Sequence, residues 1–460
     1  MNASRLALAT FCVSILIAAP SRSLAAGNAL WKAGTAKAVI TPKEPMWLAG
    51  YGARKKPAEG TQHDLYVKAL ALQDDDGRKY VLLTSDLVGI PRGVSEGVAA
   101  EVKKRTGVER PYLMLTSSHT HCGPALRDNL EVAYDMPEDE LKKIGPYTEK
   151  LQAQMVETIV AALKEMKPAK LSHATGKARF AVNRRKPTDK GIINDANPDG
   201  PVDHEVPVLR VTTADGKLLA VVFGYACHNT TLDYYKWCGD YAGFAQIALE
   251  EKHPGAQAMF FMGCGGDANP LPRRTVELCE KYGKELATAV EDVLKGELKP
   301  ITATGAARYE TIELPFDKLP QKEQLNADLL SKNYSVRKRA ERLLKTLEAG
   351  KKIDDRYPAY PVQVWRLGTE LYWVALGGEA VVDYSFRLKK ELAKHGTVWV
   401  AAYANDVMAY IPSERVLKEG GYEGDTSMVP YGLPTKWAPG IEDKIVSKVT
   451  ELAKQVAEKK

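Results

Sequence analysis

The chain has 460 residues, of which 45% are hydrophobic and 27% are charged, and its formal net charge is +6. These proportions are typical of a globular protein, and the length suffices for one large α/β domain or two smaller ones. The positive excess is spread along the chain without a block of lysine and arginine, so composition gives no reason to expect binding to nucleic acid or attraction to a membrane surface.

The first residues are typical of a secretory signal. Arg5 precedes an apolar stretch at 6–19 that is too short and wrongly flanked to cross a membrane, and the small residues at 23–26 offer a cleavage site. We therefore expect residues 1–26 to be a signal peptide and the mature protein to be secreted or periplasmic. No later segment is apolar enough to predict a transmembrane helix.

Strand-like and helix-like segments alternate along the rest of the chain. Pairs of apolar segments predict β-hairpins, at 65–72 with 80–84, 207–213 with 218–225, and 362–367 with 371–376. Further strands are predicted at 112–116, 256–262 and 397–403. Helical periodicity predicts helices at 95–106, 145–166, 274–294 and from 440 to the tail, and an amphipathic, largely solvated helical excursion at 321–350.

This pattern predicts an α/β fold with mixed sheets and antiparallel hairpins, flanked by helices. Because hairpins join antiparallel strands, the pattern does not fit a simple doubly wound parallel sheet. No linker, repeat or low-complexity stretch divides the chain after the signal, so we expect residues 27–460 to form a single domain.

Cysteine usage allows more than one interpretation. After the signal the chain keeps an odd number of cysteines, and no dense disulfide framework is recognisable although export permits disulfides. Two of them, Cys122 and Cys227, adjoin histidines. We interpret them as small buried side chains in preference to metal ligands.

Two histidines follow the strand predicted at 112–116. In a strand alternate side chains share a face, so His119 and His121 would point the same way if the strand geometry persists. Two imidazoles that open onto a turn are well placed to hold a metal and to touch what the metal binds.

Two further candidate ligands also follow apolar strands. His228 comes after 218–225, and its alternative interpretation is a core histidine hydrogen-bonded to the backbone. Glu379 follows Gly377-Gly378 and precedes a helical pattern, so it either projects a carboxylate toward a metal or favours the first turn of a helix through the helix dipole.

A glycine-rich turn follows the strand at 256–262. Its glycines allow close backbone approach, and it either exposes Asp267 and Asn269 or aims backbone N–H groups at an oxyanion. It lacks the features of a P-loop or a dinucleotide fingerprint. Near the C-terminus, Tyr410 and Tyr422 lie in turns where tyrosines usually serve packing.

Taken in chain order, these segments resemble the neutral/alkaline, non-lysosomal ceramidase family. The matching motifs cover most of the chain after the signal. In chain order they are Ile40-Thr41-Pro42, Gly50-Tyr51-Gly52, Ser118-His119-Thr120-His121-Cys122-Gly123-Pro124, Asn183-Arg184, Ala226-Cys227-His228, Gly266-Asp267, Gly378-Glu379, the turn from Asn405 to Tyr410, and Tyr422-Glu423-Gly424.

Members of that family are zinc amidases that split ceramide into sphingosine and a fatty acid. The resemblance implies a Zn²⁺ site made by His119, His228, Glu379 and Tyr410, a donor set that suits zinc. It also implies that His121, Arg184 and Tyr422 line the substrate pocket and stabilise an oxyanion. Zinc in such a site polarises a carbonyl and lowers the pKa of bound water toward ~7.

The chain departs from the family pattern in two ways. The family's Gly-Asp-Val-Ser-Pro turn carries a nucleophilic serine, whereas here Gly266-Asp267-Ala268-Asn269-Pro270 places Asn269 at that position. An amide is no nucleophile, although it can orient a water or donate a hydrogen bond to an oxyanion. We also expect no C-terminal immunoglobulin-like domain after the final helix.

The leading hypothesis is an exported zinc hydrolase that uses zinc-activated water on an amide-type bond of a small or lipid-like substrate, with Asp267 or His121 as the proton shuttle. One alternative is the same scaffold acting on an ester or a carbohydrate derivative, because function follows the site and not the fold. Arg184 and Arg185 suit an anionic or strongly polar substrate. Another alternative is a zinc-containing binding protein without catalysis, since every ligand position is filled and the serine is absent.

Overall fold

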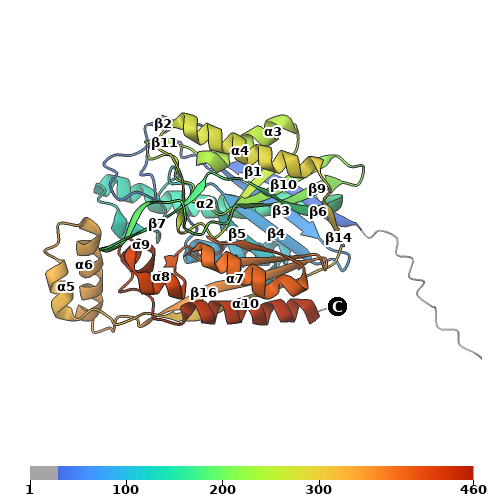
Figure 1. The fold of residues 1–460 in the computed structure, drawn as a ribbon. Coiled ribbons are helices and arrows are strands. Elements are labelled where there is room, and N and C mark those ends of the chain that lie inside the picture. Colours follow the sequence, from blue (N-terminus) through green and yellow to red (C-terminus); the bar gives the residue numbers. More distant parts are fainter. Residues whose placement is uncertain (1–29, 459–460) are drawn as a thin grey trace, which may run out of the picture.

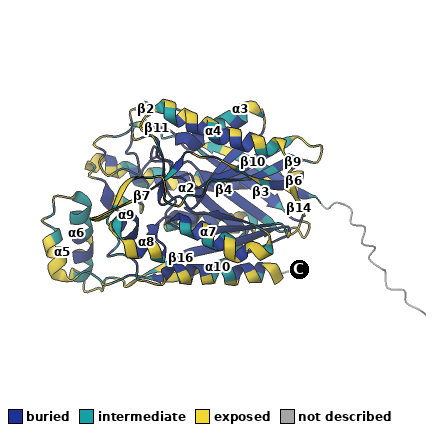
Figure 2. Ribbon diagram, in the orientation of Figure 1, coloured by how far each residue is buried: buried dark blue, intermediate teal, exposed yellow. Residues whose placement is uncertain are grey.

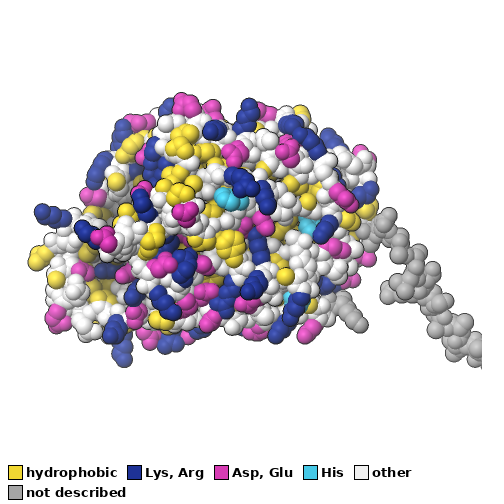
Figure 3. Space-filling view, viewed as in Figure 1, with side chains coloured by type: hydrophobic (Ala, Val, Ile, Leu, Met, Phe, Trp, Pro, Cys, Tyr) yellow, Lys and Arg dark blue, Asp and Glu magenta, His cyan; other side chains and the backbone are white. Residues whose placement is uncertain are grey.

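The structure, a computed structural model, describes residues 30–458, so the predicted secretory signal lies outside the described residues (Figure 1). Within that range, none of the helices is long and apolar enough to cross a membrane. Figure 3 shows a face of the molecule on which basic and acidic side chains are interspersed.

The larger sheet is nine-stranded and mixed, with the order β12-β10-β9-β6-β1-β3-β4-β5 and β14 paired to β6. Its parallel pairs are β4–β5 and β10–β12. Its strands are β1 (Trp31–Val39), β3 (Tyr66–Gln73), β4 (Lys79–Ser85), β5 (Leu113–Ser117), β6 (Lys167–Lys177), β9 (Glu205–Thr213), β10 (Leu218–Tyr225), β12 (Gln257–Met262) and β14 (Lys299–Ile301).

A second, four-stranded sheet is built from the later part of the chain, in the order β15-β16-β17-β19. Only its β17–β19 pair is parallel. Its strands are β15 (Gly305–Pro315), β16 (Arg356–Leu367), β17 (Leu371–Leu376) and β19 (Thr397–Ala401).

The two sheets pack face to face, with helices on their outer faces (Figure 1). Side chains alternate along each strand, so one face of each sheet enters the shared core while the other meets helices. In the shared core, Trp365, Trp373 and Trp399 of the second sheet pack on the larger one, and the rings of Phe261 and Trp373 lie 4.8 Å apart.

Most of the covering helices are amphipathic, and Figure 2 shows exposed residues turned away from the buried sheets. The larger sheet is covered by α1 (Arg92–Thr106), α2 (Glu138–Lys164), α3 (Asp240–Lys252) and α4 (Val276–Lys295), and the second sheet by α7 (Val382–Leu392) and α10 (Ile441–Glu458).

Short elements surround the ends of the strands. A three-stranded sheet contains β7 (Ala181–Thr188), β8 (Gly191–Asn197) and β13 (Ala268–Pro270), and two-stranded sheets pair β2 (Gly60–Thr61) with β11 (Lys236–Trp237) and β18 (Glu379–Ala380) with β20 (Tyr410–Ile411). The remaining α-helices are α5 (Lys322–Asp328), α6 (Tyr334–Glu348), α8 (Glu414–Glu419) and α9 (Gly421–Gly424).

The predicted fold class, with mixed sheets and antiparallel hairpins flanked by helices, is confirmed. The largest difference in a predicted boundary concerns the helix expected at 145–166, which starts at Glu138 and continues through Pro146. Acidic residues at 138–140 favour this earlier start because they lie at the positive end of the helix dipole. The excursion at 321–350 consists of two helices, and the second begins at the N-cap Asn333.

The five cysteines in the described range are buried and form no disulfide, in agreement with the interpretation of Cys122 and Cys227 as small buried side chains.

Candidate metal centre and catalytic site

The four predicted metal ligands lie together where strands of both sheets end. His119 follows β5 and His228 follows β10, so both come from the larger sheet, whereas Glu379 follows β17 and Tyr410 follows β19 of the second sheet. The parallel pairing of β18 with β20 places Glu379 directly opposite Tyr410. All four side chains are buried.

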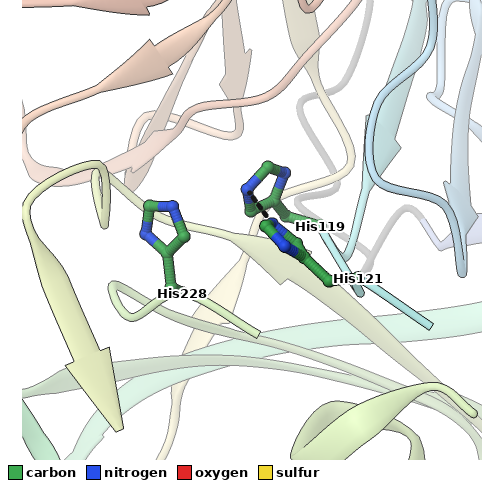
Figure 4. A group of neighbouring side chains, drawn as sticks. All are labelled: His119, His121 and His228. Atoms are coloured by element: carbon green, nitrogen blue, oxygen red, sulfur yellow. Dashed lines mark hydrogen bonds between the residues drawn. The ribbon is translucent and has the colours of Figure 1, made fainter. Parts of the chain in front are cut away.

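His119 and His121 also lie together, although not for the reason expected from the sequence. The strand geometry does not persist, because β5 ends at Ser117 and His119 has φ 61, in the left-handed region. The shared-face argument is therefore wrong. The turn nonetheless brings the Nε2 atoms of the two histidines to 3.1 Å from each other (Figure 4).

The histidines predicted as ligands are oriented by backbone carbonyls. His119 Nδ1 lies 2.6 Å from the carbonyl oxygen of Val88, and His228 Nδ1 lies 2.7 Å from that of Gly265. A carbonyl only accepts, so each Nδ1 carries the proton and each Nε2 keeps its lone pair. This is the arrangement of metal-ligating histidines, whose second nitrogen donates to a carbonyl or carboxylate.

The carboxylate of Glu379 faces both lone pairs. Glu379 Oε2 lies 3.1 Å from His119 Nε2 and 3.1 Å from His228 Nε2. Burial and the Arg184 guanidinium lower the pKa of His228 to about 3, so this imidazole is neutral.

Three hydrogen-bond acceptors, the two Nε2 atoms and Glu379 Oε2, point toward one another, and this arrangement shows whether the residues fit a metal ion. Two lone-pair nitrogens and a carboxylate oxygen that face one another repel unless positive charge lies between them. The Tyr410 hydroxyl is 2.9 Å from His228 Nε2. Bonds of 2.0–2.1 Å to a tetrahedral ion place neighbouring ligand atoms about 3.3 Å apart. The residues therefore fit a four-coordinate ion.

His121 is the third imidazole of the cluster, in which the ring nitrogens of His119, His121 and His228 lie within 4.8 Å of one another. Burial and the neighbouring imidazoles hold the pKa of His121 well below its usual value. Its Nδ1 has no hydrogen-bond partner among the residues that the structure describes. The Tyr51 ring packs on it, with ring centroids 4.6 Å apart. Gly50 passes so close that an added Cβ would lie 2.3 Å from its Cγ.

Arg184 connects the ligands to the other predicted residues. Its guanidinium donates to the Tyr410 hydroxyl at 3.0 Å and to Asn269 Oδ1 at 3.3 Å. Its Nε pairs with Glu423 at 2.7 Å. The Tyr422 ring lies 5.3 Å from that of Tyr410 and is 37% exposed, so Tyr422 stands at the surface above the buried cluster.

Asp267 takes a different position from the other predicted catalytic residues. Its two carboxylate oxygens accept from the backbone N–H of Val382, at the start of α7, and from the side chain of Asn183. Burial raises the pKa of Asp267 to about 7. These contacts join β13, β7 and α7.

Sequence analysis missed three polar residues of the site. The hydroxyls of Tyr403 and Tyr431 both donate to the Glu379 carboxylate, and Glu423 pairs with Arg184 and Arg185. The tyrosines lie in turns without a recognisable spacing. Glu423 stands next to the predicted site residue Tyr422, and Arg184-Arg185 are consecutive in the sequence. These two features were the only sequence signals for an ion pair between Glu423 and the arginines.

The fold and site define a mixed α/β protein with a buried histidine and carboxylate centre of the kind that holds a metal. The sequence model of the neutral/alkaline non-lysosomal ceramidase N-terminal region matches residues 31–308, more than half of the chain. The chain therefore belongs to this family, as the sequence motifs predicted.

Solved structures share the fold. A ceramidase complexed with C2 superposes with a TM-score of 0.72 at 17% identity, covering 93% of this chain and 75% of that one. The neutral ceramidase from Pseudomonas aeruginosa gives a TM-score of 0.72 at 18% identity, covering 93% and 74% of the two chains. No curated protein matches the chain in sequence. Family membership and the shared fold support a ceramidase-like hydrolase.

Proposed function

We propose that this protein is an exported zinc-dependent hydrolase that cleaves an amide-type bond in a small or lipid-like substrate. His119, His228, Glu379 and Tyr410 are the proposed ligands. The proposal is supported above all by one observation: Glu379 Oε2 lies 3.1 Å from Nε2 of both His119 and His228, and each of these nitrogens keeps its lone pair. The chemistry that zinc supplies when bound is polarisation of a carbonyl and a lower pKa for water, toward ~7.

The side chains around the ligands supply the remaining steps. Hydrolysis breaks the C–N bond, adds the water oxygen to the acyl carbon and delivers a proton to the departing nitrogen. We assign that proton transfer to His121, whose Nε2 is next to the ligand cluster. The contacts of Asp267 suit a role in holding β13, β7 and α7 together.

Hydrogen-bond donors around Tyr410 are placed to stabilise the negative charge that develops on the carbonyl oxygen of the substrate. Arg184 contacts both Tyr410 and Asn269, and Tyr422 lies above them. Donors fixed in a buried site stabilise an oxyanion without reorganising. Asn269 accepts from Arg184 through Oδ1, so its amide N–H groups remain to orient the attacking water or the substrate carbonyl. The proposed route therefore needs no serine.

Metal content and hydrolysis together test the proposal. We expect about one zinc per chain, lost in His119→Ala and kept in His173→Ala. His173 is also buried but lies on β6, against Trp399. A panel of fluorogenic amides, esters and glycosides then defines the bond. Ester or glycoside turnover without amide turnover would move the assignment to the alternative substrate classes.

Two further outcomes would overturn the proposal. Zinc bound with no turnover across the panel would indicate a binding protein. Unchanged zinc content in His119→Ala would show that the ligand assignment is wrong. Export is tested separately, by cell fractionation and by sequencing the N-terminus of the mature protein, which we expect to start near Gly27.

A further inference from the structure

We propose that the cavity beside Asn269 binds a carboxylate of the substrate through Arg273, so that the preferred substrate is an amide with a carboxylate close to the bond that is cleaved. This inference rests on the proposed hydrolase function and adds the substrate class.

The cavity has a volume of about 470 Å³ and lies between the β7–β8 hairpin and the loop that follows β13. Its wall is mostly apolar, with Val182, Ala196 and Leu271 among the lining residues. Asn269 and Arg273 supply polar groups. This combination suits a ligand with a hydrophobic body and one anionic group.

Arg273 differs from the other arginines of the site. Arg184, Arg185 and Arg274 each pair with a carboxylate, the last with Asp233 at 3.3 Å. The contact of the Arg273 guanidinium is the Thr230 hydroxyl at 3.3 Å, and no carboxylate of the described residues lies within ion-pair distance of it.

Arg273 has cationic neighbours. Burial is the main cause that lowers the pKa of Arg273, the guanidinium groups of Arg274 and Arg184 lower it further, and Tyr51 and Cys227 act in the opposite direction. Asp195, which also lines the cavity, is already paired with Lys186 at 2.7 Å. A half-buried guanidinium without a counter-charge is a favourable site for a carboxylate, which it can bind through two parallel hydrogen bonds.

The cavity is connected to the proposed metal site by an unbroken row of polar contacts. The Thr230 hydroxyl that accepts from Arg273 lies 3.5 Å from Asn269 Oδ1, and Asn269 accepts from Arg184. Arg184 in turn donates to the ligand Tyr410. Asn269 therefore lines the cavity and also contacts Arg184, which contacts the proposed metal ligand Tyr410.

Three substrates test the charge and its position. N-lauroyl-phenylalanine carries the carboxylate on the amine side, N-glutaryl-phenethylamine carries it on the acyl side, and N-lauroyl-phenethylamine is the neutral counterpart of the first. We expect the protein to prefer one of the charged amides over the neutral one, and the preferred compound identifies the side of the scissile bond that faces the cavity.

Arg273→Gln is expected to lower kcat/KM for the preferred charged amide about 10- to 100-fold, mainly through KM, as for loss of a charge-assisted hydrogen bond. The neutral amide should change less than about 2-fold by the same argument. Arg273→Lys should restore part of the loss. Arg105→Gln also removes one positive charge, from an exposed ion pair with Glu157, and should change neither substrate.

An equal loss for charged and neutral amides in Arg273→Gln, or a wild-type protein without preference for a carboxylate, would overturn the inference. Should no amide be hydrolysed, calorimetric binding of N-lauroyl-phenylalanine to the zinc-loaded protein decides the question separately. Weaker binding to Arg273→Gln by about 10-fold or more would support the carboxylate site while the hydrolase proposal fails, and equal binding would overturn both.

Discussion

At the scale of single residues, the site depends on a backbone position without a side chain. Gly50 has φ 91 and passes directly beside the His121 ring. It belongs to the Gly50-Tyr51-Gly52 motif, which also provides the tyrosine that packs on His121. Only glycine combines this backbone conformation with this closeness.

Gly50→Ala should therefore abolish most of the activity. The new Cβ would displace His121, and the left-handed backbone would cost about 1–2 kcal/mol of folding free energy. Gly216→Ala is the matched control, because Gly216 also has φ 91 but has nothing within 4 Å of an added Cβ. Thermal unfolding should show both variants destabilised, Gly50→Ala more strongly because of the added clash, while kcat/KM falls only in Gly50→Ala. Wild-type activity in Gly50→Ala would contradict the role of His121.

Tyr431 is expected to tune the metal through Glu379. Its hydroxyl donates to Oε1, the carboxylate oxygen that does not face the histidines. Loss of an outer partner of a metal ligand typically lowers metal affinity about 10- to 100-fold. Tyr431→Phe should show this decrease in a competitive chelator titration. Tyr147→Phe, which loses a hydrogen bond to Ile40 far from the site, should keep the wild-type affinity. Equal affinities would show that Tyr431 does not position the carboxylate.

Three of the proposed ligands, His119, His228 and Glu379, could be recognised as candidates because each follows an apolar strand, whereas Tyr410 was implied only by the family resemblance. The sequence could not predict which groups hold these side chains. His119 and His228 are fixed by carbonyls of Val88 and Gly265, and a carbonyl leaves no residue-type signal. Tyr403 reaches Glu379 only because the turn at 402–405 passes between β12 and β5. Such contacts depend on tertiary structure.

At the scale of elements, a buried ion cluster joins α9 to β7. Glu423 on α9 accepts from Arg184 at 2.7 Å and from Arg185 at 2.7 Å, and all three side chains are buried. Removing one partner of a buried ion pair leaves uncompensated charge. This cluster therefore positions Arg184 against Tyr410 by holding two short elements together.

Glu423→Gln should lower the free energy of unfolding by about 3 kcal/mol at pH 7. Burial alone would raise the pKa of Glu423, but the two guanidinium groups hold it below its usual value. The stabilisation is thus complete above the unfolded pKa, near ~4.3, and is lost as pH falls through the lower folded pKa. Denaturant unfolding between pH 7 and pH 3 should show wild type and variant converging at the acidic end.

Glu157→Gln is the control for this prediction. Glu157 pairs with Arg105 at the fully exposed surface, where an ion pair is screened by solvent and contributes little to stability. A gap between wild type and Glu423→Gln that persists unchanged at acidic pH would contradict the assigned role of the Glu423 charge.

The hairpins were predictable because their strands alternate or run continuously apolar, whereas β6, β8 and β15 were not. Gly191–Asn197 of β8 is polar and largely exposed, and it becomes a strand by pairing with β7. Lys167–Lys177 of β6 lies between β1 and β9 without a clear alternation of its own. Strand formation there depends on neighbours distant in sequence.

At the scale of the whole molecule, the proposed metal site connects the two sheets. Two of its ligands follow strands of the larger sheet and two follow strands of the second. A ligand that binds only the folded state stabilises it by mass action. Because the ligands come from both sheets, an ion at this site ties the sheets together at their ends.

Removal of the metal should therefore lower the melting temperature of the entire protein. At free zinc of 100 times Kd the bound ion contributes about 2.7 kcal/mol. Calorimetry should show a lower Tm after chelation, restored by Zn²⁺ and not by Mg²⁺, which prefers oxygen ligands. His119→Ala should not respond to the chelator. A wild-type Tm that is insensitive to chelation would contradict a metal link between the sheets.

The placement of the ligands along the chain also sets an order in time. The family match ends at residue 308, whereas Glu379 and Tyr410 lie well beyond it. A ribosome therefore synthesises the two histidines long before the carboxylate and the phenol that complete the proposed site. At the proposed site, full-affinity metal binding therefore requires that the chain has been synthesised at least as far as Tyr410.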